Sequence, residues 1–476
     1  MASGAEEYVV VPEGWLSRGE AFVRGDHAQL AVFGGIPGER ARVRLLERGG
    51  HQHRARYVKP EGPRHPERVE PPCDRYVPCG QCPLMHLTPA GQGRVRVNLL
   101  KQAFEAERAP TDFDFSPLVP VANAAAAASH TIELIAGWSD ERHLRLGVPG
   151  KDGRKVVPIP LCHIATEPLR RVMTNTAHHL GAQKIYPWEG HRGSFRGLFA
   201  RQSTTGGVFI TLVFARPSMF AKSLAEAVAA QLPECHGVFA HWNDVPGPLL
   251  GRSAESGDPE VSAVYGRTSL EEEVSGLKIR LGAVDPFPSV PSVGIALWEA
   301  LVDALAPAPG DTVVDLGAGA GTGARTLLLA RRAGWALGID PQEGVIRRAR
   351  ENAAANNISA DFLSGAIAEG LEASRPRLAG RRPFVVVDVG PKGLDGPTME
   401  QVLALDPRRV ALVSTNPRSL ARDIARFAAH GLRLARLAPY DTAPHTPFGE
   451  TFALLTSDDT TAPTLRAPRR RTVRAG

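Results

Sequence analysis

Three of the five cysteines in this chain stand close together, as Cys73, Cys79 and Cys82 in the stretch CDRYVPCGQC. A fourth, Cys162, follows much later in VPIPLCHIA. Three close thiolates and one distant thiolate could bind a zinc ion in tetrahedral geometry or a 4Fe–4S cluster. Two histidines could replace a thiolate in a zinc site, namely His86 and His163. The spacing predicts a metal site, with zinc and iron–sulfur both open.

A glycine run follows a strand-like segment in TVVDLGAGAGTGARTLLLA. Gly317, Gly319 and Gly321 would let the backbone approach a ligand closely at the start of a helix. Asp340 ends the next expected strand, where an acid can bind ribose hydroxyls. A dinucleotide site would need G-x-G-x-x-G, which occurs only from Gly319 and with alanine in the last place. Asp315, just before the glycines, and their alternate spacing favour S-adenosylmethionine; a dinucleotide or a turn without ligand remain alternatives.

The elements around this run alternate between β and α patterns from about residue 286 onward. The expected strands are TVVDLG, WALGID, FVVVDVG and RVALVST, with amphipathic helices between them. Such alternation is typical of a doubly wound parallel sheet, here a Rossmann-like α/β domain over residues 286–460.

The N-terminal part, residues 1–59, has a β pattern with a basic face. Ala41, Val43 and Leu45 alternate with arginines along one expected strand. A small β-barrel with a cationic face would suit binding along a nucleic-acid backbone, and an ordinary solvated face is the alternative. The candidate RNA-binding residues are Arg40, Arg42, Arg44, Arg54 and Arg56.

The segments between and after these domains are less regular. The Pro-rich stretch 59–72 is expected to be a linker, and a helix is expected over 91–108. Strand-like runs such as GGVFITLVFA predict an α+β domain within residues 60–285. The pattern does not predict how its elements are arranged. The tail 461–476 is rich in arginine, so we expect it to be disordered and to bind polyanions.

The net charge of +6 favours a polyanionic partner, RNA or DNA, although an arginine-rich proteome would give the same balance. No apolar run reaches 18 residues, and MASGAEEYVV lacks the apolar core of a secretory signal. We therefore expect a cytoplasmic monomer without membrane contact, in which a structural disulfide is disfavoured.

The cysteine spacing, the flanking RVEPPC and the later C-H-I together resemble the RNA uracil-5-methyltransferase family, in its 23S ribosomal RNA branch. IPGERARVRLLER resembles the core of its TRAM domain, and VYGRTSLEEEVSGLKIRL resembles the strand pair that enters its catalytic domain. The resemblance implies an OB-like TRAM β-barrel, a central cluster domain and a C-terminal S-adenosylmethionine domain. It also implies a 4Fe–4S cluster on Cys73, Cys79, Cys82 and Cys162, with a structural or RNA-positioning role. Ribosomal RNA is then the first candidate partner and tRNA the second, and Cys235 is left as a core residue.

The nucleophile of that family is missing. In the family, a cysteine thiolate adds to carbon 6 of uracil, which activates carbon 5 for methyl transfer. The matching stretch here is VSTNPRSLARD, with Thr415 at the nucleophile position. A threonine hydroxyl is not ionised near neutral pH and would need a strong adjacent base.

Other motif positions have changed as well. A Gln and an Asn of the family correspond to Ser289 and Pro291 in PFPSVPS. Asp388 is kept in DVGPKG, although Val389 replaces a proline. The last motif is PHTPFGE. It keeps His445 and the expected base Glu450, and it has Phe448 where the family has a histidine.

Two functions follow from this uneven pattern. The first is an RNA methyltransferase that acts on an atom already nucleophilic, lined by Asp388, Asn416 and Glu450. The second is a catalytically silent relative that binds RNA. Affinity for S-adenosylmethionine distinguishes them, because only the enzyme must bind it.

Overall fold

The structure is a computed structural model that describes residues 6–25, 27–111, 119, 129–138, 144–150, 156–188, 192–251 and 261–457. The basic tail that we predicted over 461–476 lies outside these residues. In the described part of the chain, no helix is long and apolar enough to span a membrane.

The N-terminal part forms a sheet in the order β1-β5-β6-β4-β3-β2, which is antiparallel except where β4 pairs with β6. Ala41 and Val43 are buried in β5, while Arg42 and Arg44 alternate with them at the surface. The expected two-faced strand is therefore confirmed. The strands are β1 (Glu7–Val10), β2 (Gly14–Trp15), β3 (Ala21–Val23), β4 (Gln29–Phe33), β5 (Ala41–Glu47) and β6 (Gln52–Pro60).

The Pro-rich stretch after β6 is packed against this sheet, so its prediction as a linker is wrong. The Arg68 guanidinium is buried, forms an ion pair with Glu39, and stacks 3.7 Å from the centroid of the Tyr57 ring. The backbone N–H of Val69 donates to the carbonyl of His86 at 2.9 Å. Composition alone did not reveal this buried ion pair, which fixes the segment in place.

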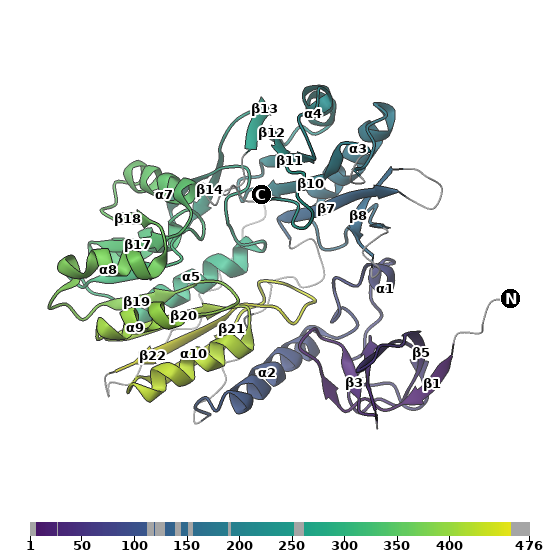
Figure 1. Cartoon of the computed structure of the whole chain (residues 1–476), viewed down its shortest axis with the longest axis horizontal. Coiled ribbons are helices and arrows are strands. Elements are labelled where there is room, and N and C mark those ends of the chain that lie inside the picture. The colour runs from purple at the N-terminus through teal and green to yellow at the C-terminus, as the bar shows by residue number, and fades with distance from the viewer. Residues whose placement is uncertain are drawn as a thin grey trace, which may run out of the picture.

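Two helices follow, α1 (Tyr76–Cys79) and α2 (Pro89–Ala106). Helix α2 starts two residues before the predicted 91–108 because the Thr88 hydroxyl caps it, accepting from Gly91 N at 3.1 Å, and Pro89 occupies its first turn. Leu100 and Phe104 of α2 join an apolar cluster of the C-terminal sheet. The helix therefore lies beside the C-terminal domain, along α10 (Figure 1).

The central part is a sheet in the order β13-β12-β11-β10-β7-β8-β9, with two helices packed on it. Phe195, Leu198 and Phe214 lie at the centre of its apolar core. The strand expected at 206–215 is β11. The elements are β7 (Thr131–Trp138), β8 (Leu144–Pro149), β9 (Val156–Pro158), α3 (Glu167–Ala182), β10 (Phe195–Gln202), β11 (Val208–Phe214), α4 (Phe220–Ala230), β12 (Cys235–Trp242) and β13 (Val261–Gly266).

An antiparallel pair, β14 (Leu270–Val274) and β15 (Leu277–Leu281), leads into the C-terminal domain, as the resemblance implied. The C-terminal sheet has the order β18-β17-β16-β19-β20-β22-β21, parallel from β18 to β20 and antiparallel at β22 and β21. The strands are β16 (Val313–Leu316), β17 (Ala336–Asp340), β18 (Asp361–Ser364), β19 (Phe384–Val387), β20 (Arg409–Ser414), β21 (Arg433–Pro439) and β22 (Thr451–Thr456).

The four predicted strands of this domain are thus present as β16, β17, β19 and β20, and the pattern missed β18, β21 and β22. Helices connect the strands and bury their apolar faces on the sheet. They are α5 (Pro291–Leu305), α6 (Ala324–Ala333), α7 (Glu343–Ala355), α8 (Ile367–Leu378), α9 (Gly396–Ala404) and α10 (Pro417–Ala429).

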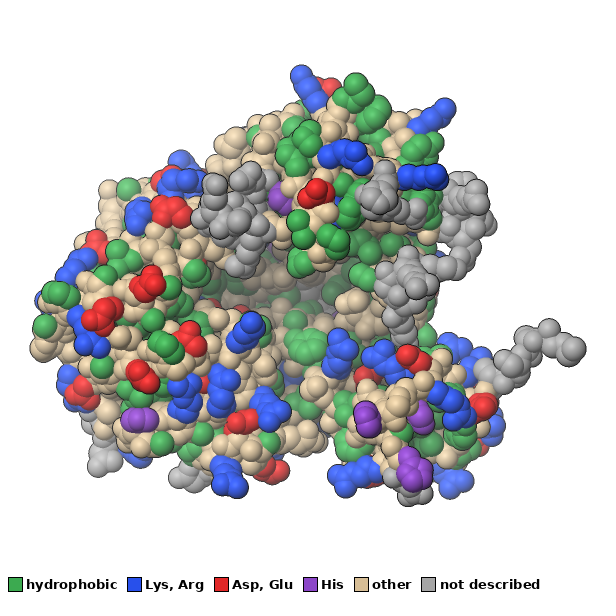
Figure 2. All heavy atoms as spheres, viewed as in Figure 1, with side chains coloured by type: hydrophobic (Ala, Val, Ile, Leu, Met, Phe, Trp, Pro, Cys, Tyr) green, Lys and Arg blue, Asp and Glu red, His purple; other side chains and the backbone are tan. Residues whose placement is uncertain are grey.

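The three parts surround a hollow. In Figure 1 the N-terminal sheet lies at the lower right, the central sheet at the upper right and the C-terminal domain at the left. The space-filling view shows the same face hollowed between them (Figure 2).

Candidate active site and cysteine group

The glycine run turns at the carboxyl end of β16. The φ of Gly317 is 80°, and a Cβ there would lie 1.9 Å from the carbonyl oxygen of Asp388, so only glycine fits. The N–H of Gly319 donates to Asp340 Oδ2 at 3.0 Å. A Cβ on Gly319 would meet that same carboxylate at 2.7 Å. The turn and the acid at the end of β17 are therefore in direct contact.

Asp340 is buried, and burial raises the pKa of its carboxyl, offset by hydrogen bonds from the N–H groups of Gln342 and Gly319. These two bonds hold the carboxylate at the strand end.

Asp315 has partners in helix α6. Its carboxylate accepts from Arg325 Nη2 at 2.8 Å and from the Thr326 hydroxyl at 2.6 Å, and the Asp315 side chain is fully buried. Its role toward a cofactor stays a prediction. The Arg325 guanidinium also donates to the Gly317 carbonyl at 3.0 Å and to Asp388.

Arg325 was missed by the sequence reasoning, although it links the cofactor turn to the Asp388 carboxylate. It is fully buried, and the two aspartates raise the pKa of its guanidinium against the effect of burial, so it stays charged. The available signal was an arginine two residues after the last glycine of the run, at the start of the helix.

Thr415 lies at the carboxyl end of β20, beside Glu450. The antiparallel pairing of β20 and β22 ends at Ser414 opposite Thr451, so Thr415 and Glu450 are the next residue on each strand. Asp388 follows the neighbouring strand β19. The sheet therefore brings the nucleophile position and the two acids of the candidate site to one edge.

Thr415 lines a cavity of about 540 Å³ between the C-terminal domain, helix α2 and the N-terminal domain. Its lining residues are Ser17, Leu99, Gln102, Ala103, Ala106, Pro391, Thr415, Asn416, Pro417, Arg418, Pro447 and Phe448. Its volume lies within the range of small-molecule sites.

The Glu450 carboxyl is the most perturbed acid of this group. Burial and the nearby Asp388 carboxylate raise its pKa to about 7, while Arg325 and the Thr442 hydrogen bond act in the opposite direction. A carboxyl with a pKa near neutrality can take up and release a proton at working pH, as a general base requires.

The loop that carries Glu450, residues 441–450, is fixed from helix α2. Arg96 is buried, lies 2.7 Å from the Asp441 carboxylate, and donates to the Thr446 carbonyl at 2.7 Å. Gln92 contacts His445 twice, through the ring Nδ1 and the backbone N–H, both at 3.1 Å. His445, kept from the family motif, therefore has a structural partner. No motif in α2 predicted that this helix would hold the loop.

The positions that differ from the family have structural tasks. The Ser289 hydroxyl accepts from the Thr131 hydroxyl at 2.8 Å, and the Ser289 carbonyl accepts from His130 N at 2.7 Å, which joins two domains. Pro291 is the first residue of α5. Neither is placed in the Thr415 cavity.

Cys162, although distant in sequence, lies near enough to Cys73, Cys79 and Cys82 to interact with them electrostatically. Burial is the main cause of the raised pKa of Cys73, Cys79 and Cys82, to about 12 for Cys82, and the nearby Cys162 thiol adds to the rise in all three. Cys235 is half-buried against the central core, where burial raises its pKa to about 11. Within the described residues, no set of three or more Cys, His, Asp or Glu side chains is close enough to hold a single metal ion.

His86 is committed elsewhere, which removes it as an alternative ligand. One ring nitrogen lies 2.9 Å from the Tyr76 hydroxyl and the other 3.1 Å from the Gly35 carbonyl. Burial lowers its pKa to about 4, so it is neutral at physiological pH.

The basic face of the N-terminal sheet is partly neutralised. Arg42 forms an ion pair with Glu61 at 2.6 Å, and Arg44 with Glu7 at 2.8 Å. Arg44 and Arg56 lie opposite each other in the β5–β6 pair, and Arg54 is 3.9 Å from Glu20. Arg40 is exposed. The strand pattern placed Arg42 and Arg44 correctly on the outer face of β5, whereas Arg40 precedes the strand, and the pattern did not reveal the acidic partners.

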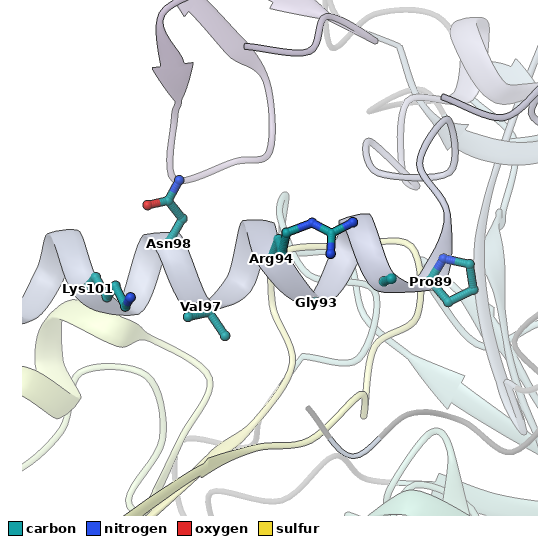
Figure 3. A pocket seen from close by; sticks show the side chains of 7 residues that line it. Pro89, Gly93, Arg94, Val97, Asn98 and Lys101 are labelled. Atoms are coloured by element: carbon teal, nitrogen blue, oxygen red, sulfur yellow. The ribbon is translucent and has the colours of Figure 1, made fainter. Parts of the chain in front are cut away.

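A second cavity, of about 600 Å³, runs along another side of α2 (Figure 3). Its described lining residues all belong to this helix and include no carboxylate, thiol or hydroxyl. Arg94 and Lys101 give it positive charge, and Arg94 is paired with Glu67.

No family model matches the chain. An uncharacterized RNA methyltransferase of Porphyromonas gingivalis is 27% identical over 472 residues, covering 92% of this chain and 97% of the relative. A 23S rRNA (uracil(1939)-C(5))-methyltransferase of Shewanella sp. strain W3-18-1 is 29% identical over 428 residues, covering 89% of this chain and 90% of the relative.

Among solved structures, the Pyrococcus abyssi tRNA (uracil-54, C5)-methyltransferase in complex with S-adenosyl-L-homocysteine superposes with a TM-score of 0.72 at 19% identity. The match covers 94% of this chain and all of that chain, so the two share an α/β methyltransferase fold with mixed sheets. Together with the sequence relatives, this makes the chain a homologue of RNA methyltransferases, the uracil-C5 enzymes among them.

Proposed function

We propose that this chain is an S-adenosylmethionine-dependent RNA methyltransferase. The observation that carries the proposal is the carboxyl edge of the C-terminal sheet. Along it, the Gly317–Gly321 turn and Asp340 lie next to Asp388, and Asp388 lies next to Thr415 and Glu450. A methyl donor at the turn would then face an acceptor atom between the two acids.

The acceptor is proposed to be an atom that is already nucleophilic, such as a ring nitrogen, an exocyclic group or a hydroxyl. Thr415 stands where the family's attacking thiolate would be, and a threonine hydroxyl is a far weaker nucleophile near neutral pH. Glu450, with a pKa of about 7, would accept the proton that leaves the methylated atom. Asp388 and Asn416 would orient the target nucleobase.

The four grouped thiols are proposed to hold a 4Fe–4S cluster. Four thiols are the usual donor set of such a cluster, and two observations support the proposal: Cys162 interacts electrostatically with the other three cysteines, and His86 is engaged with Tyr76 and Gly35. The cluster would stiffen the segment between the N-terminal sheet and α2. The N-terminal sheet is proposed to be a TRAM-like domain that contacts the RNA backbone.

A methyl-transfer assay tests the proposal. Purified protein, checked for iron, meets labelled S-adenosylmethionine and unmodified ribosomal RNA or tRNA, and modified nucleosides are identified by mass spectrometry. A methylated nucleoside other than 5-methyluridine is expected. If 5-methyluridine forms, the inference from Thr415 is wrong. If RNA binds but S-adenosylmethionine does not, the chain is a silent RNA-binding relative.

A further inference from the structure

Phe448 is an exposed aromatic residue at the junction of two cavities. Its side chain is 47% exposed. It lines the Thr415 cavity and also a smaller cavity of about 270 Å³, whose lining includes Arg18, Arg54 and Cys79. We refer to this smaller cavity as the Arg18 cavity. An aromatic ring that is exposed and lines two cavities offers a flat apolar face on which a ligand could stack.

The loop that presents Phe448 is held rigidly. The Phe448 N–H donates to the Thr446 hydroxyl at 3.1 Å, and that hydroxyl donates to the Ala443 carbonyl at 2.8 Å. Arg96 holds the Thr446 carbonyl from behind, and Leu84 N donates to the His445 carbonyl at 2.9 Å. A ring on a fixed loop loses little conformational freedom on binding, which favours its use as a contact surface.

The N-terminal domain is in contact with the same loop. Gly19, with a φ of 84°, sits so close that a Cβ would lie 3.3 Å from Pro447 and 3.1 Å from Leu84. The neighbouring Arg18 therefore stands beside the Phe448 loop, in the Arg18 cavity. The Arg18 cavity and the Thr415 cavity share Phe448 as a lining residue.

Both cavities carry arginine side chains. Arg18 is exposed, and no described acidic side chain lies within ion-pair distance of it. Arg54 is 3.9 Å from Glu20 in the Arg18 cavity. Arg418, in the Thr415 cavity, is 78% exposed and paired with Glu107, an exposed pair of little net energy. Cations that flank an exposed aromatic ring are typical of sites for single-stranded nucleic acid.

We propose that Phe448 stacks on a base that flanks the target nucleotide, in a single-stranded RNA segment running from the Arg18 cavity to the Thr415 cavity. The inference rests on the proposed function and adds a positioning residue to it. Stacking on Phe448 fixes the strand, so that the neighbouring nucleotide reaches the edge of the sheet at Thr415. A histidine at this position would offer a smaller, titratable ring, whereas phenylalanine offers a larger apolar face.

The test uses a single-stranded oligoribonucleotide in which 2-aminopurine replaces one base, with the full chain and its metal content intact. Stacking on an aromatic ring quenches this probe. Phe448→Ala is expected to weaken binding about 5- to 150-fold and to abolish the quenching. Phe448→Trp is expected to keep both. Phe220→Ala is the matched control, because Phe220 is 42% exposed on α4, outside both cavities.

The outcomes separate the two proposals. If Phe448→Ala binds and quenches like the parent protein while the parent still methylates RNA, the stacking proposal is overturned and the proposed function stands. The stacking proposal is also overturned if the parent protein binds only duplex RNA. If the parent binds the oligonucleotide and Phe448→Ala does not, but no methylated nucleoside is formed, the stacking proposal stands and the proposed function fails.

Discussion

Replacing Glu450 by glutamine should make the protein more stable at alkaline pH, and the size of the effect follows from its surroundings. Burial and Asp388 raise the pKa of Glu450 from 4.5 to about 7. At about 1.4 kcal/mol for each tenfold change in the proton equilibrium, this amounts to roughly 3 kcal/mol. That energy is the cost of holding an ionised carboxylate there.

The sign follows from proton binding. Between pH 4.5 and about 7 the folded protein keeps the Glu450 proton, whereas the unfolded chain has lost it. The contribution of Glu450 to the free energy of unfolding therefore falls as pH rises through this window and is constant above it. Glutamine cannot ionise, so the free energy of unfolding of the Glu450→Gln variant does not include this decrease with pH.

The measurement is urea unfolding of parent and variant at about pH 4.5 and about pH 8, followed by tryptophan fluorescence. The difference between variant and parent should grow by about 3 kcal/mol in favour of the variant at the higher pH. The matched control is Glu400→Gln on the exposed side of α9, for which no such growth is expected.

The same variant tests the chemistry. If Glu450 is the base, methyl transfer in the parent should rise with pH through about 7, and Glu450→Gln should lose about 10²- to 10⁴-fold in rate. A difference in unfolding free energy that does not change with pH would refute the reasoning, because Glu450 would then be ionised in the folded protein at neutral pH.

Three further predictions concern other parts of the molecule. Thr415→Cys should gain formation of 5-methyluridine, detected by nucleoside mass spectrometry, and Thr415→Ser should not. Cys82→Ser should lower the iron content of the purified protein, whereas Cys235→Ser should leave it unchanged; equal loss in both would contradict the assigned ligands. Gly319→Ala should weaken S-adenosylmethionine binding in calorimetry, since its Cβ would lie 2.7 Å from Asp340; unchanged affinity would place the cofactor elsewhere.

Sequence reasoning located the strand ends well. The four parallel strands β16, β17, β19 and β20 are short, continuous apolar runs, each close to a glycine or a polar residue, so they were visible without a structure. Their carboxyl ends carry Gly317, Asp340, Asp388 and Thr415, which parallel pairing must bring to one edge. The edge strand β21 could not be identified, because its alternation of arginine and leucine resembles a solvated surface.

Side-chain contacts between residues far apart in the chain could not be predicted from the sequence pattern. Arg325 joins Asp315 to Asp388, and Arg96 fixes the 441–450 loop from a helix some 350 positions earlier in the chain. Both are arginines in a chain rich in them, and only burial distinguishes them from solvated ones. The Pro-rich linker failed as a prediction for the same reason, since Arg68 is buried.

The acids beside Thr415 bear on our proposal that it does not replace the missing thiolate. A threonine hydroxyl needs a strong base beside it to become an attacking group. Asp388 is engaged in an ion pair with Arg325. Glu450, with a pKa of about 7, can accept a proton from a methylated ring nitrogen but is far too weak to ionise an alcohol. The charges of this site therefore favour an acceptor atom that carries its own lone pair.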